Sequence, residues 1–465
     1  MKSPDAPNAA DDTLYNLRLP ELDPFLHSVP SKSDAQYAPP PAPKVTVDGN
    51  AVPPNALHNL TASLYKMRWP SQLTSILAQL THMLGHSNLI YFPNLCARYG
   101  GAAFLLPYFV SYVCVGIPLL YAEMILGQFS SLPPTEIFRR MSPPLAGIAL
   151  AMLAVTIYRA LYFSALISQL FYAAALTIPG IFTGSLPGSN CEDPEFSSNY
   201  CHSPSVERVC NTSRLPEEHY QLCDRYLVGL HHPNRVWVPP HSDYMIGAVF
   251  KPRFRANEIR MPSTAVSGIL LAVWVFSSMC AFKGARRVAC AFTCVKAISI
   301  FIVVVNLFIS IFSQYGQDGG LTYFFSPDFS HLSDLETWSS AISHVLFSLN
   351  LGDGTVYRLA SYNNFNENSI FNAMIISVSD VVVSLIAGAT FFTSVGTISQ
   401  SLYSRPDVTL QSRIRRTLFS GFTLSMTAFP DQLALSDAPA LWTTVVSSAH
   451  YINLAKSGFS NLVKL

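Results

Sequence analysis

The chain has 465 residues, half of them hydrophobic and only 12% charged, with a formal net charge of +1. The charged fraction is about half of the roughly 25% that is usual for soluble proteins, so we expect an all-α membrane protein. The balanced charge gives no argument for a nucleic-acid partner. The sequence contains no G-x-S-x-G, phosphate-binding loop or metal-hydrolase helix motif, so we do not expect an enzyme.

The first 70 residues are polar and rich in proline, as in the stretch "QYAPPPAPKV". They lack the hydrophobic segment of a signal peptide, and their composition predicts a disordered cytoplasmic tail over residues 1–70. The sequon at Asn59 falls in this tail and is expected to stay unused.

Residues 71–465 form the predicted transmembrane domain. A helix needs about 20 mostly apolar residues to span a bilayer, and the chain offers eight candidate spans. The first is the broken stretch 71–99, and the others are 102–122, 145–178, 264–282, 288–317, 338–352, 369–404 and 439–455.

The basic residues predict which side each loop faces. Lys66 and Arg68 precede the first span, Arg139 and Arg140 follow the second, and Lys283, Arg286 and Arg287 lie between the fourth and fifth. Cytoplasmic loops carry an excess of Lys and Arg, which predicts a cytoplasmic N-terminus. The four arginines of residues 405–416 then fall outside, against this rule.

The segment 179–262 is therefore a predicted extracellular loop. It contains the sequon Asn211-Thr212-Ser213 and four cysteines, at positions 191, 201, 210 and 223. Disulfides and N-glycans both form on the oxidising side of the membrane. We expect disulfides in this loop and a glycan on Asn211.

Two of the spans are interrupted by glycine and polar residues. The first breaks at Gly85-His86-Ser87-Asn88, and the sixth breaks at "SLNLGDG", residues 348–354. Non-helical backbone at membrane depth is tolerated only where protein or a water-filled cavity surrounds it. Paired interruptions in the two halves of a membrane protein indicate a transporter binding site. The alternative is a pair of ordinary kinks in structural helices.

Several motifs resemble the neurotransmitter:sodium symporters, the sodium- and chloride-dependent solute carrier family 6. They are "FPNLCARYGGAAFLLPYFVSYVCVGIPLLYAEMILGQF" in spans 1 and 2, "HVLFSLNLGDGTVYRLASYNNF" in span 6, and "FPDQLALSDAPALW" before span 8. The resemblance covers roughly Lys66 to the C-terminus. It implies an inverted-repeat transporter fold with discontinuous helices 1 and 6, and about eight transmembrane helices of an expected twelve.

The resemblance also implies ligands for ions and a solute, and no further cofactor. A first sodium site would use the Met83 carbonyl with Asn88, Ser348 and Asp380. A second would use the carbonyls of Thr81 and Leu84 with Asn453, Lys456 and Ser457. Chloride would be bound by Tyr108, His344, Ser348 and Ser384, and a solute by Gly85, Ser87, Phe347, Asn350 and Asp353. Cys201 and Cys210 occupy the positions of a loop disulfide in the animal members.

Some residues depart from the family pattern. Asp380 replaces an asparagine ligand, and a charged carboxylate would strengthen Na⁺ binding, although it could equally pair with Arg159 or hold a proton. Lys456 replaces an oxygen ligand, and an ammonium group has no acceptor for an ion. It would therefore take the place of the second sodium, or extend to water from a helix end. Gly85 stands where amine-selective members have an aspartate, which favours an amino-acid-type solute.

Two functions follow from these motifs. The first is a plasma-membrane symporter that couples Na⁺, with Cl⁻ as a second candidate ion, to uptake of an amino acid or similar small solute. The second is a non-transporting, truncated member that acts in the lipid bilayer as a binding partner in hetero- or homo-oligomers. Asn88 and the second break favour the first function. Lys456, Tyr91 in place of a gating arginine, and the end of the chain after the eighth span favour the second.

Overall fold

The computed structural model describes residues 46–47, 50–51, 68–189, 191, 200–203, 210, 223–224, 236–250, 263–282, 297–309, 317–403, 409–418, 422–435 and 443–452. Its contacts separate two units, Met1–Arg68 and Trp69–Leu465. In the first unit, strands β1 (Thr46–Val47) and β2 (Asn50–Ala51) pair antiparallel. Of the predicted disordered tail, residues 68–70 are also described, and the rest lies outside the described residues.

The described part of the second unit is mostly helical, with an isolated β-bridge between Cys201 and Val238. Its first half contains α3 (Gln72–Met83), η1 (Ser87–Tyr91), α4 (Phe92–Arg98), η2 (Gly101–Phe104), α5 (Leu105–Ser111), η3 (Tyr112–Gly116), α6 (Ile117–Ser130), α7 (Pro134–Met141), η4 (Pro143–Leu145), α8 (Ala146–Thr177) and α9 (Pro179–Thr183). Its second half contains α12 (Pro240–Met245), η6 (Ile246–Phe250), α13 (Thr264–Phe282), α15 (Gln317–Phe325), η7 (Phe329–Ser333), α16 (Leu335–Ser348), α17 (Thr355–Ala360), α18 (Ser369–Leu402), α19 (Leu410–Leu418) and α20 (Phe422–Leu435).

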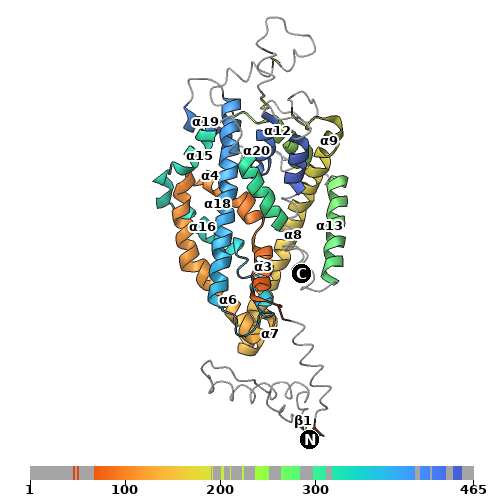
Figure 1. The fold of residues 1–465 in the computed structure, drawn as a ribbon, viewed down its shortest axis with the longest axis vertical. Helices are drawn as coiled ribbons and strands as arrows, with labels where there is room; N and C mark the ends of the chain where they lie inside the picture. The colour runs from red at the N-terminus through yellow and green to blue at the C-terminus, as the bar shows by residue number, and fades with distance from the viewer. Residues whose placement is uncertain are drawn as a thin grey trace, which may run out of the picture. The chain divides into compact units, whose positions relative to one another are not determined.

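Three helical stretches in the described residues are long and apolar enough to cross a membrane: Gly101–Ser130, Ala146–Thr183 and Ser369–Leu402. They contain most of the predicted spans 102–122, 145–178 and 369–404. Shorter apolar helices cover Thr264–Met279 and Ala297–Ile309. In Figure 1, α8 and α18 run along the long axis of this unit, α6 and α7 lie at its lower end, and α9, α12 and α19 lie at its upper end.

The long helix α18 shows how the unit is adapted to lipid. Its buried face carries Ser377, Asp380 and Ser384, which are three and four residues apart and therefore share one side of the helix. Val378 and Val382 on the other side are 56% and 48% exposed. A helix of a soluble protein buries its apolar side, so the reversed pattern on α18 fits a helix whose outer face meets hydrocarbon.

Both predicted interruptions are present. α3 ends at Met83 and the chain becomes helical again at Ser87, where η1 begins as a π-helical turn. α16 ends at Ser348, and α17 begins at Thr355. The two broken helices lie in the same hydrophobic core, which also receives α5 and α18.

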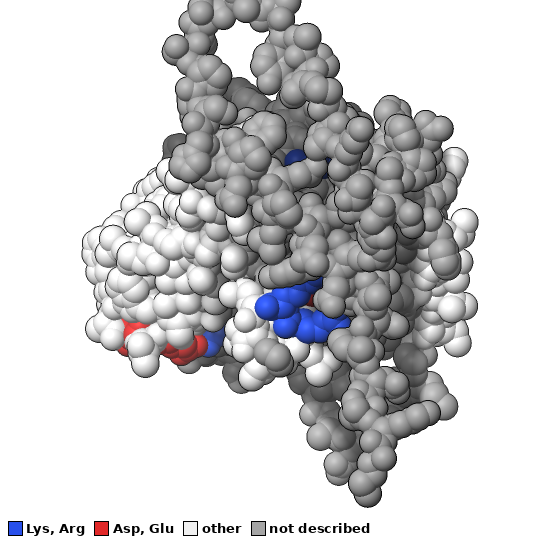
Figure 2. Space-filling model, turned by 90° about the horizontal axis from the view of Figure 1, so that it is seen from below, with Lys and Arg blue, Asp and Glu red and all other residues white. Residues whose placement is uncertain are grey.

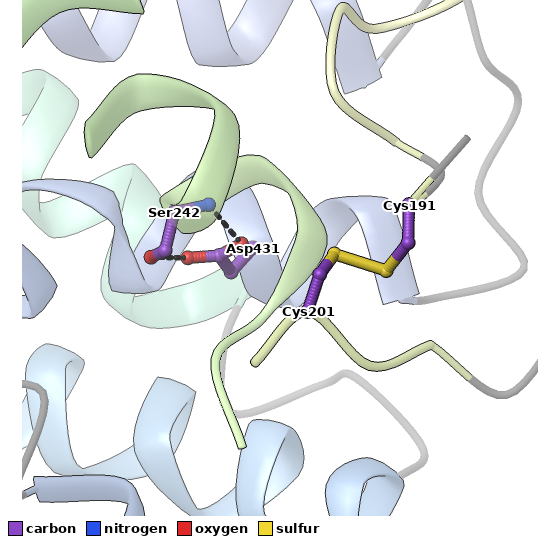
Figure 3. The surroundings of a disulfide bond; sticks show 4 residues. All are labelled: Cys191, Cys201, Ser242 and Asp431. Atoms are coloured by element: carbon purple, nitrogen blue, oxygen red, sulfur yellow. Dashed lines mark hydrogen bonds between the residues drawn. A yellow bond between two sulfur atoms is a disulfide. The ribbon is translucent and has the colours of Figure 1, made fainter. Parts of the chain in front are cut away.

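The predicted disulfide between Cys201 and Cys210 is wrong. Cys201 is bonded to Cys191 and Cys210 to Cys223, with Cα–Cα distances of 5.8 and 5.3 Å. The Cys201 segment is fixed by backbone hydrogen bonds on either side of it, from His202 N to Val238 O and from Val238 N to Tyr200 O, and this places its sulfur beside Cys191 (Figure 3). The expectation that this loop carries disulfides is confirmed, and Asn211 lies outside the described residues.

A buried carboxylate lies close to this disulfide, between α12 and α20. Asp431 accepts hydrogen bonds from the backbone N–H of Ser242 at 3.1 Å and from the Ser242 hydroxyl (Figure 3). Burial is the largest cause that raises the pKa of Asp431, to about 7, with a smaller contribution from the charge of Asp243. Burial away from water disfavours the charged carboxylate, and the hydrogen bonds from Ser242 offset this effect only in part.

Candidate functional site

The first interruption is held together by the amide of Asn88. The helix α3 stops because Leu84 adopts an extended conformation, with φ −66° and ψ 119°. The Asn88 Oδ1 atom accepts hydrogen bonds from the Gly85 backbone N–H at 3.1 Å and from the Ser87 hydroxyl at 3.0 Å. One uncharged side chain therefore satisfies donors that the broken helix leaves without backbone partners.

Asp380 on α18 faces this interruption. Asn88 Nδ2 donates to its Oδ1 atom at 2.8 Å, the Ser348 hydroxyl donates to its Oδ2 atom at 2.8 Å, and the Tyr112 hydroxyl also donates to Oδ2. Asp380 is fully buried, and it has no salt-bridge partner among the described residues. A buried carboxylate without a counter-charge is costly, so a cation bound here would stabilise the cluster.

Three of the four residues predicted for the first sodium site are thus joined directly by hydrogen bonds: Asn88, Ser348 and Asp380. The fourth, Met83, is the last residue of α3, and the final carbonyls of a helix have no partner within it. The described residues contain no group of three or more His, Cys, Asp or Glu side chains that could hold a metal ion. Oxygen ligands from Asn, Ser and one carboxylate suit a hard cation rather than a transition metal.

The second interruption has a different backbone. After α16 ends at Ser348, positive φ angles occur at Asn350 (52°), Gly352 (76°) and Gly354 (79°). The left-handed region costs little for glycine and is tolerated by asparagine. The Gly352 backbone N–H donates to Glu123 Oε1 on α6 at 2.8 Å, so this buried side chain supports the turn.

An arginine from α8 closes this second interruption. Arg159 Nη1 donates to Asp353 Oδ2 at 3.0 Å, and Nη2 donates to the Phe347 carbonyl at 2.9 Å. Nη2 also donates to Asn350 Oδ1 at 2.8 Å. Asp353 Oδ1 in turn accepts from the Thr355 N–H at 2.9 Å, at the start of α17. The cation thus lies at the carboxyl end of α16 and the carboxylate at the amino end of α17, as the helix dipoles favour.

The two interruptions touch each other. Asn350 Nδ2 donates to the His82 carbonyl at 2.6 Å, and the Ser348 and Ser87 hydroxyls are 3.2 Å apart. The Phe347 ring lies 5.5 Å from the ring of Tyr91, between centroids. The first broken helix (α3, η1 and α4, called helix 1 below) and the second (α16 and α17, called helix 6 below) therefore converge with α8 and α18 on one polar centre inside an apolar bundle.

This convergence of two broken helices agrees with the match of the chain to known proteins. The model of the sodium:neurotransmitter symporter family matches residues 66–461. The chain belongs to this family. Its members are transporters, and the multi-pass membrane character of the family agrees with the apolar helices described above.

Relatives within the symporter family are identical to this chain at about a quarter of the aligned residues. It is 26% identical over 377 residues to the sodium-dependent serotonin transporter of Drosophila melanogaster, covering 81% of this chain and 55% of that protein. It is 25% identical over 385 residues to the sodium- and chloride-dependent neutral and basic amino acid transporter B(0+) of Mus musculus, covering 81% and 58%. It is 25% identical over 394 residues to the sodium- and chloride-dependent glycine transporter 1 of Xenopus laevis, covering 85% and 59%. The chain spans between 55% and 59% of the length of these curated relatives.

The chloride ligands predicted from the symporter family lie around the same cluster. The rings of Tyr108 and His344 are 5.7 Å apart, between centroids. Asn88 Nδ2 donates to the Ser384 hydroxyl at 2.9 Å, and Ser348 donates to the Asp380 carboxylate. His344 is buried, and within the described part of the chain its Nε2 atom has no hydrogen-bond partner.

The second sodium site predicted for this family member is only partly described. Thr81 and Leu84 are both buried near the end of α3. The other three residues, Asn453, Lys456 and Ser457, lie outside the described residues. The hypothesis that Lys456 takes the place of the second sodium stays a prediction.

All five residues predicted to contact a solute lie at the interruptions, but the residues of the first interruption have a different hydrogen-bond partner from those of the second. Gly85 and Ser87 donate to Asn88, as described above, whereas Phe347, Asn350 and Asp353 all accept hydrogen bonds from Arg159. The alternative that Arg159 pairs with Asp380 is wrong, because the guanidinium is already held by acceptors of helix 6.

Sequence reasoning missed Tyr112 and the partner of Arg159. Tyr112 lies four residues after the predicted ligand Tyr108, and this spacing puts both side chains on one helix face; their ring centroids are 5.0 Å apart. The spacing could therefore have identified Tyr112. Arg159 is the single charge in its apolar span, and an intramembrane charge is expected to have a partner, but nothing along the sequence points to Asp353.

Proposed function

We propose that this protein is a secondary active transporter that couples Na⁺ to the movement of an amino acid or similar small solute across the plasma membrane. The observation that carries the proposal is the fully buried Asp380 carboxylate, which has three hydrogen-bond donors and no cation among the described residues. The names of the fly, mouse and frog relatives all describe sodium-dependent transporters, which supports Na⁺ as the cation.

Sodium at this position would connect three parts of the molecule. Asn88 belongs to helix 1, Ser348 to helix 6 and Asp380 to α18. An ion that is coordinated by all three favours the arrangement in which they are close together. Its loss removes that tie and leaves the buried carboxylate unneutralised, which favours a rearrangement of the broken helices. This is the way in which an ion gradient can drive alternating access in transporters with broken helices.

Chloride is the second candidate ion of the proposal. The mouse and frog relatives are named as sodium- and chloride-dependent. The predicted ligands Tyr108, His344, Ser348 and Ser384 lie around the Asp380 cluster. Because Ser348 already donates to the Asp380 carboxylate, an added anion would be repelled by that charge. We therefore propose a smaller contribution from chloride than from sodium.

The proposed topology has residues 1–70 in the cytoplasm and the loop 179–262 outside the cell. The disulfides Cys191–Cys201 and Cys210–Cys223 support the outer position of the loop. α7 carries Arg139 and Arg140, which both pair with Glu136. The view from below in Figure 2 shows a compact group of basic side chains among the described residues. Loss of a glycosidase-sensitive gel shift in Asn211→Gln, expressed in animal cells, would support this orientation.

A non-transporting binding partner of other family members is the second candidate function. It is favoured by Arg159, which already occupies Phe347, Asn350 and Asp353, three of the five predicted solute contacts. A chain with this function would bind Na⁺ without accumulating any solute.

The test is sodium binding and uptake by the purified full chain. In proteoliposomes with an inward Na⁺ gradient, the proposal predicts accumulation of a solute from a panel of labelled amino acids and small carboxylates, and none when K⁺ replaces Na⁺. Asp380→Asn should abolish the sodium requirement or the uptake. Asp431→Asn is the matched control, because it changes another buried carboxylate, between α12 and α20. Sodium binding without uptake by the wild type would favour the second candidate, and absence of both would refute the first.

A further inference from the structure

Helix 6 breaks around an internal cation. The acceptors at this break are the Phe347 carbonyl, the Asn350 side-chain oxygen and the Asp353 carboxylate, and Arg159 bonds to all three at 2.8 to 3.0 Å. The guanidinium carbon also lies 4.6 Å from the centre of the Phe347 ring, within the range of a cation–π contact. An ammonium group of a solute bound at the predicted contacts Phe347, Asn350 and Asp353 would compete for these same acceptors.

The two charges of the pair are not equally accessible. The Asp353 side chain is 1% exposed, whereas the Arg159 side chain is 14% exposed. A charged solute that approaches the break therefore meets the cation first. Within the described residues, Arg159 makes its hydrogen bonds through Nη1 and Nη2 only. Its Nε–H, one of the five guanidinium donors, remains for an acceptor such as a carboxylate oxygen.

We infer that Arg159 is a specificity-determining residue of the central site, which excludes an ammonium group at the helix 6 break and favours a small carboxylate that lacks one. This inference rests on the proposed function. Of the two solute classes in that proposal, an amino acid or a similar small solute, it selects the similar small solute. An ammonium group would have to displace a guanidinium that has a buried carboxylate, a carbonyl and an aromatic face as partners. A carboxylate keeps this pair intact and adds an interaction with the accessible cation.

The test uses L-lactate and L-alanine, which differ only in a hydroxyl or an ammonium group on the same carbon. Binding of each is measured by the thermal shift of the purified full chain in saturating Na⁺. Wild type should bind lactate at least about tenfold more tightly than alanine, a ratio that corresponds to about 1.4 kcal/mol. Arg159→Gln should reverse the preference by opening the three acceptors to alanine. Arg358→Gln, which removes an exposed arginine of α17, should keep the wild-type preference.

Asp353→Asn provides a second variant that does not depend on the folding of Arg159→Gln. It removes the anion of the pair and leaves Arg159 in place, so lactate should bind more tightly than to the wild type and alanine should remain excluded. Equal binding of lactate and alanine to the wild type would overturn the inference. It would also be overturned if neither ligand bound to the wild type or to any variant. The sodium-induced shift without any solute reports on the proposed ion site separately, so its loss would refute the proposed function instead.

Discussion

The two broken helices differ in how the buried charge at each break is neutralised. At the first break, the amide of Asn88 bridges the backbone to Asp380, and the described residues supply no positive charge to this cluster. At the second break, Arg159 and Asp353 form a complete ion pair across the ends of α16 and α17. The carboxyl group at the first break therefore has no counter-charge among the described residues, and the pair at the second break is neutral without any ligand.

This difference predicts which break depends on an ion. A buried charge that lacks a partner is stabilised by whatever cation binds it, whereas a satisfied pair gains nothing from one. The first break should respond to Na⁺ and the second should not. The backbone differs in the same sense, because positive φ angles occur at Asn350, Gly352 and Gly354 in the second break and at no residue from Met83 to Asn88.

The largest expected effect comes from breaking the ion pair of the second break. Arg159→Gln leaves the carboxylate of Asp353 buried without a cation, which should lower the free energy of unfolding by about 3 kcal/mol. The double variant with Asp353→Asn should recover much of this loss. Chemical denaturation of the purified chain, with and without Na⁺, measures both. A loss below about 0.5 kcal/mol would mean that the pair behaves like an exposed salt bridge.

Removing the carboxylate at the first break should change the free energy of unfolding in the opposite direction. In sodium-free buffer, Asp380→Asn should raise the free energy of unfolding by about 2 kcal/mol, because an uncompensated buried charge is lost. In Na⁺ at about 100 times its Kd, the wild type should gain about 2.7 kcal/mol that the variant does not. A sodium titration of the unfolding midpoint tests this, and an equal sodium response of both proteins would contradict it.

Asp431 provides a comparison with the carboxyl groups at the breaks, because it is also hydrogen-bonded but lies away from both breaks. Its folded pKa of about 7 is above the usual value for an unfolded aspartate, about 3.9. The folded state therefore holds this proton more tightly, and the stability that it provides is lost as the pH rises through 7. Between pH 6 and 8 the wild type should lose about 1.4 kcal/mol relative to Asp431→Asn. A pH series of unfolding midpoints measures this, and parallel curves would show that Asp431 does not titrate between pH 6 and 8.

The backbone of the second break should tolerate a side chain poorly at its left-handed glycines. Gly352 has open space around it, so Gly352→Ala should cost about 1 kcal/mol from its positive φ alone. Gly268→Ala on α13 is the matched control, because it is also exposed with open space and has a helical conformation. That change should be neutral or stabilising. Equal effects of the two substitutions on the unfolding midpoint would mean that the left-handed turn is not required.

Chloride should have the smallest effect. Because Asp380 already places a negative charge beside the proposed sodium, replacing chloride by gluconate should raise the sodium concentration for half-maximal stabilisation by about twofold, which is roughly 0.4 kcal/mol. In Asp380→Asn, any remaining sodium response should depend more strongly on chloride. A complete loss of sodium stabilisation in wild type without chloride would show that the anion is required in addition to Asp380.

Much of the ion cluster was predictable from the sequence because its members carry local signals. Gly85 to Asn88 and the "SLNLGDG" stretch interrupt apolar spans, and both interruptions occur where predicted. Asp380 is the single charge in a long apolar segment, and an intramembrane charge marks a functional position. Asn88, Ser348 and Asp380, which were predicted together from the family motifs, do lie together.

The partners within the tertiary structure were less predictable. Arg159 was a candidate partner of Asp380, but it pairs with Asp353. Cys201 was paired with Cys210, but its sulfur is bonded to Cys191. Both errors concern residues that meet only because distant segments pack together, and neither hydropathy nor spacing along the chain carries that information.

The sequence by itself determined that this chain belongs in a membrane, where its helices break, and which family it joins. These follow from composition, from the length of the apolar spans and from motifs, all of which are properties of neighbouring residues. Only the tertiary structure decided that the first break keeps an unpaired carboxylate while the second is closed by Arg159. That outcome depends on which side chains α8 and α18 present to helices 1 and 6, because a buried charge is stabilised by groups within a few ångströms, however far apart they are in the sequence.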